Sequence, residues 1–247
     1  LKATQLGVLT TSQAEALTSS QVLSLTSTQL PLLKAETLNA IAPSKIAALS
    51  TEQLSFISDI QFVNLSTSIV NTLTTAQVDS LSTAQLRALT EDQIIALNSA
   101  QLAVLTSADW KALRADQLMA IATDQVTFIS TTALAAFDTA QIAALISTAG
   151  NAGLSSTQII ALTTEHFASL TSTQMSALTS SQVAAIATDD LVALNSSQFN
   201  ALTSDQIKAL TTLQLSNLSA DQLAGMTTED IVCLLYTSDA ADDSLRV

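Results

Sequence analysis

The sequence is poor in the residues that usually mark special chemistry or tight turns. Of its 247 residues, one is cysteine, one is histidine, two are proline and four are glycine, and aromatic residues make up 3%. A single cysteine excludes a disulfide framework within the chain and a CxxC zinc or redox site. With one histidine, no nucleophile and base are singled out as a pair. We therefore expect no catalytic, cofactor-binding or metal-ligating residues, and we expect the chain not to be an enzyme.

Charged residues are also scarce. They make up 12% of the chain, and 8 Lys and Arg against 21 Asp and Glu give a net charge of −13. This balance argues against a surface that binds nucleic acid or an anionic membrane. No apolar run approaches the roughly 18 residues of a membrane-spanning helix, so we expect no membrane insertion. Apolar residues nevertheless make up 48% of the chain, which is enough to bury a core.

An eight-residue repeat fills nearly the whole sequence. Octads such as LTTSQAEA and LTSSQVLS follow one another from Leu1 to Ala144 as 18 units. One irregular nine-residue unit covers 145–153, and ten further octads begin at Leu154. We therefore divide the chain into a repeat array at 1–144, the irregular unit at 145–153, a second array at 154–232, and a tail at 233–247.

The eight positions, named a to h, have different residue preferences. Positions a and f are apolar in all 28 octads, position e is Gln in 20, and position b is Ser, Thr, Asn or Asp in 22. A strand would place a and f on opposite faces, because they are five residues apart. A continuous helix would wind the leucine row around its whole surface, because eight residues overshoot two turns. Neither continuous element fits the pattern.

A short helix in each octad does fit. With b as the N-cap, Ser or Thr at b and Gln at e form a capping box, in which each side chain bonds the other's backbone N–H. Apolar residues at a and f form the accompanying hydrophobic staple. Pro43 falls at the first helical position, where its missing N–H costs nothing. Pro31 falls at g and should distort the last turn of its helix.

Helices of about six residues are unstable alone because nucleation is costly, so the octads must stack. We predict an all-α solenoid of very short helices, one per repeat. The alternative fold is a β-solenoid with corners between a and f, which would need Gly or Asn at the corners and β-branched residues in the strands. Four glycines and abundant Ala, Leu and Gln favour helices. Two octads would make one turn of sixteen residues, a length that the sequence does not fix.

Residues that suggest chemistry each have a structural interpretation. His166 occupies position e, where a ring nitrogen can replace the capping amide of Gln. Asp109, Asp190 and Asp230 also occupy e, where a carboxylate can serve the same role. Trp110 occupies f and is expected in the core.

Two further motifs have equally plain interpretations. Acidic pairs such as Glu91–Asp92 lie at helix N-termini, where the helix dipole favours them without a metal. The segment GNAG at 150–153 lacks the spacing and the lysine of a phosphate-binding loop. We interpret it as a slip in the repeat that gives a local bend or a sub-array boundary.

The tail breaks the pattern. Residues 233–247 read CLLYTSDAADDSLRV, and Cys233 to Asp242 resemble the translation of a transposase-type sequencing adapter. The chain also begins at Leu1 in the middle of the repeat pattern. We therefore expect an internal fragment of a longer reading frame, from assembled environmental DNA, with a non-native tail.

Octads of the form L-T-x-x-Q-[IVL]-x-A, such as LTSSQVAA at 178–185, resemble tandem arrays in very large bacterial surface or secreted proteins. These proteins are often labelled adhesin-like or haem-utilisation-like, and the resemblance covers Leu1 to about Val232. It implies an extracellular or cell-surface location and a structural or adhesive role. The haem-utilisation label transfers no ligand residues, so we predict no haem site and no other cofactor.

A second resemblance is rejected. LTSSQVAAIATDD at 178–190 resembles the first helix of the transcription activator-like effector repeat. That family's period of about 34 residues and its variable base-reading pair are absent here.

The sequence leaves two interpretations of function. The first is a non-catalytic structural module, a stalk or spacer, whose partners are the neighbouring domains of the same parent chain. The second is a repeat solenoid that binds a protein or glycan through exposed positions c, d and g. The second interpretation requires apolar or charged residues at g to gather on one face, and the sequence shows no obvious patch of this kind.

Overall fold

The computed structural model describes residues 2–147 and 153–232, and they form short helices separated by extended residues. No strand occurs within these two ranges. The all-α prediction is therefore confirmed, and the β-solenoid alternative is wrong. The tail at 233–247 and the GNAG motif, apart from Gly153, lie outside the described residues. The chain divides into two compact units, Leu1–Ile129 and Ser130–Val247.

Most octads follow the predicted local geometry. In one octad, Leu89 at a and Thr90 at b are extended, with ψ angles of 140° and 165°, and the helix α11 (Glu91–Ile95) follows. The Thr90 hydroxyl accepts from the Gln93 N–H at 3.2 Å, and the Gln93 side chain accepts from the Thr90 N–H at 2.7 Å. No described residue has a positive φ. The chain therefore turns between helices through two extended residues, without a left-handed cap.

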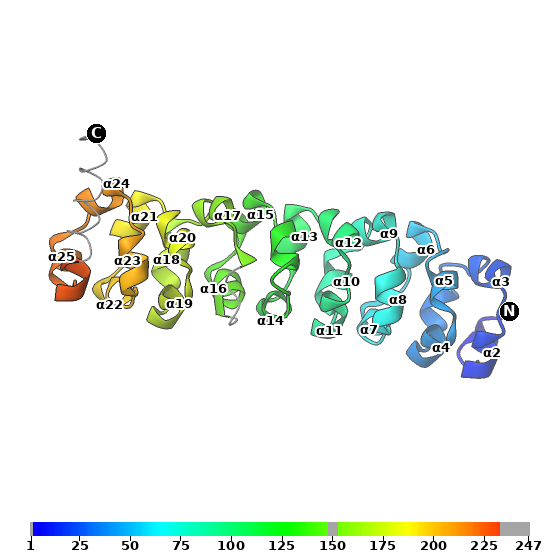
Figure 1. Ribbon diagram of the computed structural model, residues 1–247. Helices are drawn as coiled ribbons and strands as arrows, with labels where there is room; N and C mark the ends of the chain where they lie inside the picture. Colours follow the sequence, from blue (N-terminus) through cyan, green and yellow to red (C-terminus); the bar gives the residue numbers. More distant parts are fainter. Residues whose placement is uncertain (1, 148–152, 233–247) are drawn as a thin grey trace, which may run out of the picture. The chain divides into compact units, whose positions relative to one another are not determined.

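The helices of unit 1 stack side by side along the chain (Figure 1). Most of them contact the helix three octads further along, so they form three rows. The first row holds α2 (Thr11–Glu15), α4 (Ala35–Ala40), α7 (Asp59–Val63), α10 (Thr83–Ala88) and α13 (Ser107–Ala112). The second row holds α3 (Ser19–Leu23), α5 (Pro43–Ile46), α8 (Thr67–Thr72), α11 and α14 (Ala115–Met119). The third row holds α6 (Thr51–Ser55), α9 (Thr75–Asp79), α12 (Ser99–Ala103) and the 3-10 helix η2 (Gln125–Phe128).

Two further elements lie near the N-terminal end of unit 1, α1 (Ala3–Leu6) and the 3-10 helix η1 (Leu30–Leu32). Pro31 lies inside η1, and no α-helix forms in its octad. The predicted distortion by Pro31 is confirmed. Pro43 lies at the start of α5, as expected.

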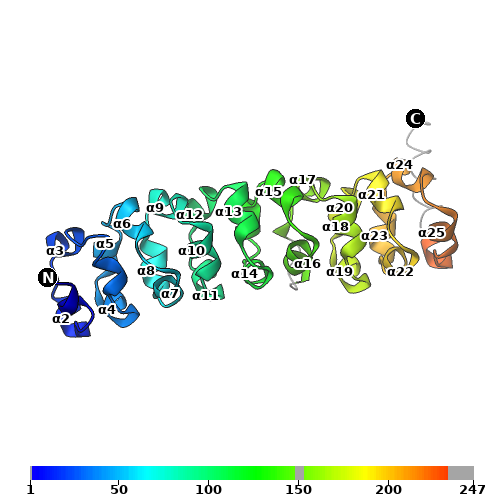
Figure 2. The same cartoon turned by 180° about the vertical axis from the view of Figure 1, so that it is seen from behind.

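Unit 2 repeats the three rows (Figure 2). The first row holds α15 (Thr131–Ala136), α17 (Ser156–Ile160), α20 (Ser180–Ala184) and α23 (Ser204–Lys208). The second row holds α16 (Thr139–Ser147), α18 (Thr164–Ser169), α21 (Thr188–Val192) and α24 (Thr212–Ser216). The third row holds α19 (Ser172–Ala177), α22 (Ser196–Phe199) and α25 (Ala220–Ala224). The long helix α16 reaches into the irregular unit and contacts both α18 of the second row and α19 of the third row. It therefore packs against two rows.

A turn of the solenoid is longer than the two octads considered from the sequence. Helices contact those three octads away, and side chains reach backbone atoms 25–31 residues away. The leucine row at a and the apolar row at f together form the core, which includes the fully buried Trp110, Phe62 and Phe167. Position h, by contrast, is mostly half-buried or exposed.

Candidate functional site: the glutamine row between turns

The most regular polar feature of the structure is the row of side chains at position e. Most of these side chains are glutamines, and in most octads after the first few they are buried. Gln117 is 0% exposed and Gln93 is 1% exposed. A buried amide is costly unless all its polar atoms have partners. The partners of the e side chains therefore decide what this row does.

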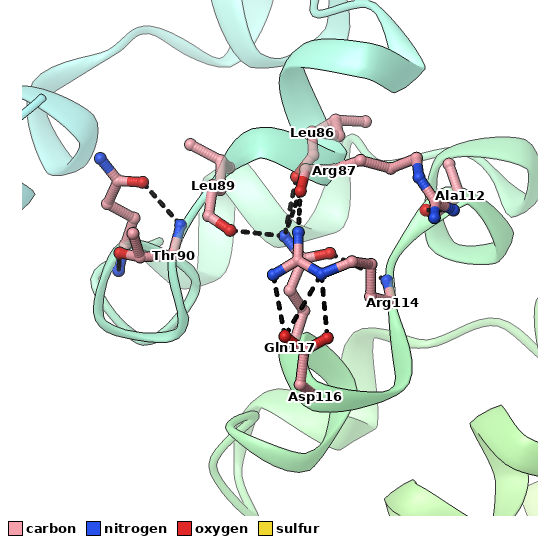
Figure 3. A network of polar contacts seen from close by, with 9 residues as sticks. Leu86, Arg87, Leu89, Thr90, Ala112, Arg114, Asp116 and Gln117 are labelled. Atoms are coloured by element: carbon pink, nitrogen blue, oxygen red, sulfur yellow. Dashed lines mark hydrogen bonds and ion pairs between the residues drawn. The ribbon is translucent and has the colours of Figure 1, made fainter. Parts of the chain in front are cut away.

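Gln117 shows the arrangement most clearly (Figure 3). Its Oε1 accepts from the Arg114 N–H at 2.8 Å and so caps the N-terminus of its own helix. Its Nε2 donates to the carbonyl oxygens of Leu86 at 2.9 Å and Leu89 at 2.7 Å. These two carbonyls lie at the C-terminal end of α10, where helix carbonyls lack partners within the helix. One side chain thus caps two helices and joins two successive turns.

The same pair of inter-turn bonds recurs along both units. The amide Nε2 donates to the carbonyls of f and of the following a, 31 and 28 residues earlier, in Gln61, Gln77, Gln85, Gln93, Gln101, Gln198, Gln206, Gln214 and Gln222. The capping half of this role follows from the sequence, but the inter-turn half was missed. One signal for it exists: a capping box accepts Glu as well as Gln, yet no octad has Glu at e.

His166 takes the place of glutamine in full. Its Nδ1 accepts from the Thr163 N–H at 3.1 Å, and its Nε2 lies 3.0 Å from the Phe137 carbonyl oxygen. Since Nδ1 accepts, the proton is assigned to Nε2, which donates to the carbonyl. The capping role predicted for His166 is confirmed, and the ring adds the same link to the preceding turn.

Replacing His166 by glutamine is expected to leave the free energy of unfolding unchanged within about 1 kcal/mol, because the amide can make both bonds. His166→Ala is expected to cost about 2–4 kcal/mol, because it leaves a buried N–H and a buried C=O without partners. Urea unfolding followed by circular dichroism measures both values. Equal losses in the two variants would contradict this role for the imidazole.

Lys45 supplies only the inter-turn half. Its ammonium donates to the Glu15 carbonyl at 3.2 Å and to the Leu17 carbonyl. Lysine has no acceptor atom, so it cannot cap the N–H of Ala42, the residue at b. The octad of Lys45 therefore has hydrogen bonds to the preceding turn although it has no capping box.

The aspartates at e behave differently from one another. Asp109 and Asp230 accept from the N–H groups of Thr106 and Thr227 at 2.8 and 3.0 Å, so their predicted capping role is confirmed. Asp190 does not have this role: its octad has Ala187 at b, and its carboxylate accepts from the Thr164 hydroxyl of the preceding turn.

Asp230 lies beside a pocket at the last described octads. A glutamine there would reach the carbonyls of Phe199 and Leu202, and both residues line a pocket of about 490 Å³ beside Asp230. Burial opposes ionisation of this carboxyl, but hydrogen bonds from the Thr227 hydroxyl and N–H outweigh it and hold the pKa of Asp230 below its ordinary value.

Where e is apolar, a residue from the preceding turn can take over the cap. Ile69 occupies e in the octad of Ser66, so no amide of its own helix reaches the Ser66 N–H. Instead the Asn39 Oδ1 accepts from this N–H at 2.7 Å, and the Asn39 Nδ2 donates to the Asn64 carbonyl at 2.7 Å. The octad pattern does not predict this role of position g, because it joins atoms of residues 25 and 27 positions apart.

Two arginines form a further link between turns (Figure 3). Arg114 binds Asp116 through Nη2 at 2.9 Å and also donates to the Arg87 carbonyl. Arg87 in turn donates to the Ala112 carbonyl at 3.0 Å. The hydrogen bond and charge of Arg114 lower the pKa of the Asp116 carboxyl. Both guanidinium groups thus bond backbone carbonyls of a neighbouring turn.

The described residues show no arrangement suited to metal chemistry. Within 2–147 and 153–232, no three His, Cys, Asp or Glu side chains gather to hold an ion. Over the same part of the chain, no helix has both the length and the hydropathy to cross a membrane. The acidic pair Glu91–Asp92 lies in the first turn of α11, where the sequence predicts it.

The family model described as the ALTTAQ repeat matches residues 70–99 and 183–219. These segments contain octads such as LTTAQVDS and LTSDQIKA and include parts of both units. No curated protein matches the chain. The all-helical structure and this match together identify the chain as a tandem-repeat protein with segments similar to the ALTTAQ repeat.

Proposed function

We propose that the chain is a non-catalytic structural module, a stalk or spacer, within a larger bacterial surface or secreted protein. One observation carries this proposal: the bonds that hold successive turns together come from the repeat itself, at position e. A solenoid of this kind gains stability from each neighbouring turn, so its length can grow by adding octads. Its direct partners are then the neighbouring domains of the same parent chain.

The surface composition supports a spacer in an extracellular or cell-surface setting. Positions b, c and d are mostly exposed and carry Ser, Thr and Asn together with acidic residues. The similarity of the octads to the arrays of large bacterial surface proteins supports the same setting. On the described residues these polar side chains give the array a hydrophilic outer face.

The proposal is tested by removing whole or partial octads. Deleting residues 178–201, three octads, is expected to preserve the helical circular dichroism spectrum. It should shorten the maximum dimension in small-angle X-ray scattering by about 10 Å, the spacing of packed helices. The smaller deletion of residues 178–197 is the control, because it moves positions a and f out of register and should lower the unfolding temperature strongly. A shortened chain that unfolds like the control would contradict the proposal.

A binding solenoid is the second candidate, and one observation favours it. Val63 and Arg87, both at position g, line a shallow pocket of about 360 Å³ together with Ile60 and Arg114. This brings apolar and charged residues of position g together on one face, as the second interpretation requires. Saturable binding in a glycan array that is lost on Ile60→Asp substitution would favour this candidate over the spacer.

A further inference from the structure

Asp190 is a carboxylate at a place where the other octads of unit 2 supply a hydrogen-bond donor. In the next octad, the Nε2 of Gln198 donates at 2.6 Å to the Leu170 carbonyl, 28 residues earlier. The octads run without interruption through this part of unit 2, so the equivalent carbonyl for Asp190 is that of Leu162. An ionised carboxylate has acceptor atoms only. Asp190 therefore cannot make the bond that an amide makes here.

Two buried oxygen atoms at this place lack a donor among the described residues. Asp190 is 8% exposed and Leu162 is 3% exposed. The Thr164 hydroxyl donates to Oδ1 of Asp190, whereas no described residue donates to Oδ2 or to the Leu162 carbonyl. Buried oxygen atoms without a partner are costly, and two facing oxygen atoms also repel each other. A positive group between them would remove both costs.

The described residues supply no basic side chain for this purpose. Lys208 is the only Lys or Arg within the described part of unit 2, and its Nζ lies 3.4 Å from the Asp205 carboxylate. His166 on α18 already uses both ring nitrogens. The other charged side chains on α18 and α21 are Glu165 and Asp189, which are exposed acids. A buried charge in such surroundings favours a cation from solution.

We propose that the Asp190 carboxylate, the Thr164 hydroxyl and the Leu162 carbonyl bind a calcium ion that joins two successive turns. These ligands are all oxygen atoms, which calcium prefers, and water completes its flexible coordination shell. The aspartate side chain ends one C–C bond, about 1.5 Å, short of a glutamine and leaves a gap of about 4 Å to the carbonyl. Two calcium–oxygen bonds of about 2.4 Å span such a gap.

The ion takes the place of the amide group and takes no part in a reaction. Only one of its ligands is an acidic side chain, so the site is not a cluster of acids. The sequence alone predicts no metal-ligating residue, because the carbonyl ligand comes from the preceding turn. A single carboxylate implies weak binding, with a Kd on the order of 10⁻³ M, as in extracellular calcium modules. The inference goes beyond the spacer role, because it makes the stability of unit 2 depend on calcium.

Hydrogen exchange of the full chain in calcium chloride tests the proposal. At about 10 mM calcium, roughly ten times the expected Kd, amides of α18 and α21 should exchange up to about tenfold more slowly. Amides of α5 in unit 1 should change little. Sodium chloride at the same ionic strength is the control for screening of the acidic net charge, and it should not reproduce the slower exchange.

Two variants separate this site from other effects of calcium. Asp190→Gln supplies an amide in the register of Gln198, so α18 and α21 should exchange slowly with or without calcium. Asp189→Asn removes an exposed acid that is not a ligand, and it should keep the calcium response of the wild type. Circular dichroism verifies that each variant is folded.

Three results would overturn the proposal. Unchanged exchange of the wild type at every calcium concentration would mean that no calcium ion lies between the two oxygen atoms. Equal slowing by sodium chloride would mean that the response is charge screening. A calcium response retained in Asp190→Gln would mean that the ion binds elsewhere.

Discussion

Replacing Gln117 by methionine is expected to lower the free energy of unfolding by about 2–4 kcal/mol. Methionine fills a similar volume but bonds neither the Arg114 N–H nor the Leu89 carbonyl, and both groups would be left buried without these partners. The Leu86 carbonyl loses less, because it also accepts from the Leu89 N–H. Urea unfolding, followed by circular dichroism and by the fluorescence of Trp110, measures the difference.

The matched control for this prediction is Gln13→Met. Gln13 also caps its own helix, through the Thr10 N–H at 3.0 Å, but it is exposed and bonds no preceding turn. Water can replace this single bond, so we expect a loss of less than about 1 kcal/mol. If the two methionine variants lose equal stability, the inter-turn bonds contribute nothing and the glutamine row acts only as a set of helix caps.

Truncating Trp110 to alanine is expected to cost about 3–5 kcal/mol, because it leaves a large cavity in the core of unit 1. The side chain is 0% exposed and lies at f on α13. Within the described residues, its indole Nε1 is the buried side-chain polar atom that has no hydrogen-bond partner. Trp110→Phe removes this unpaired donor with a smaller loss of volume, so we expect it to cost less than about 1.5 kcal/mol.

Circular dichroism during urea unfolding compares the two tryptophan variants, since neither retains the fluorophore. Hydrogen exchange then locates the loss. Because each turn is stabilised by its neighbours, amides of α10 and α13 should exchange faster in Trp110→Ala, and those of α2 should change least. Uniform acceleration along the chain would instead indicate that unit 1 unfolds as one cooperative block. Equal costs for Ala and Phe would contradict cavity volume as the source of the loss.

The features predicted correctly depend on contacts within one octad. The capping role of His166, the place of Pro43 and the distortion at Pro31 all follow from residues within a few positions of each other. Such contacts are set by local backbone geometry, so the repeat pattern predicts them directly. The exception is Asp190: with Ala187 at b its octad has no capping hydroxyl, and its carboxylate bonds to Thr164 instead.

The amino-acid sequence by itself determined that each octad is a capped helix with apolar residues at a and f, because those interactions span at most a few residues. Only the tertiary structure decided that a turn takes more than two octads and which atoms then meet across it. The second role of Gln117, the substitution by Lys45 and the cap from Asn39 all join atoms 25–31 residues apart. That separation depends on how the helices pack around the core, and an eight-residue period alone is compatible with several such packings.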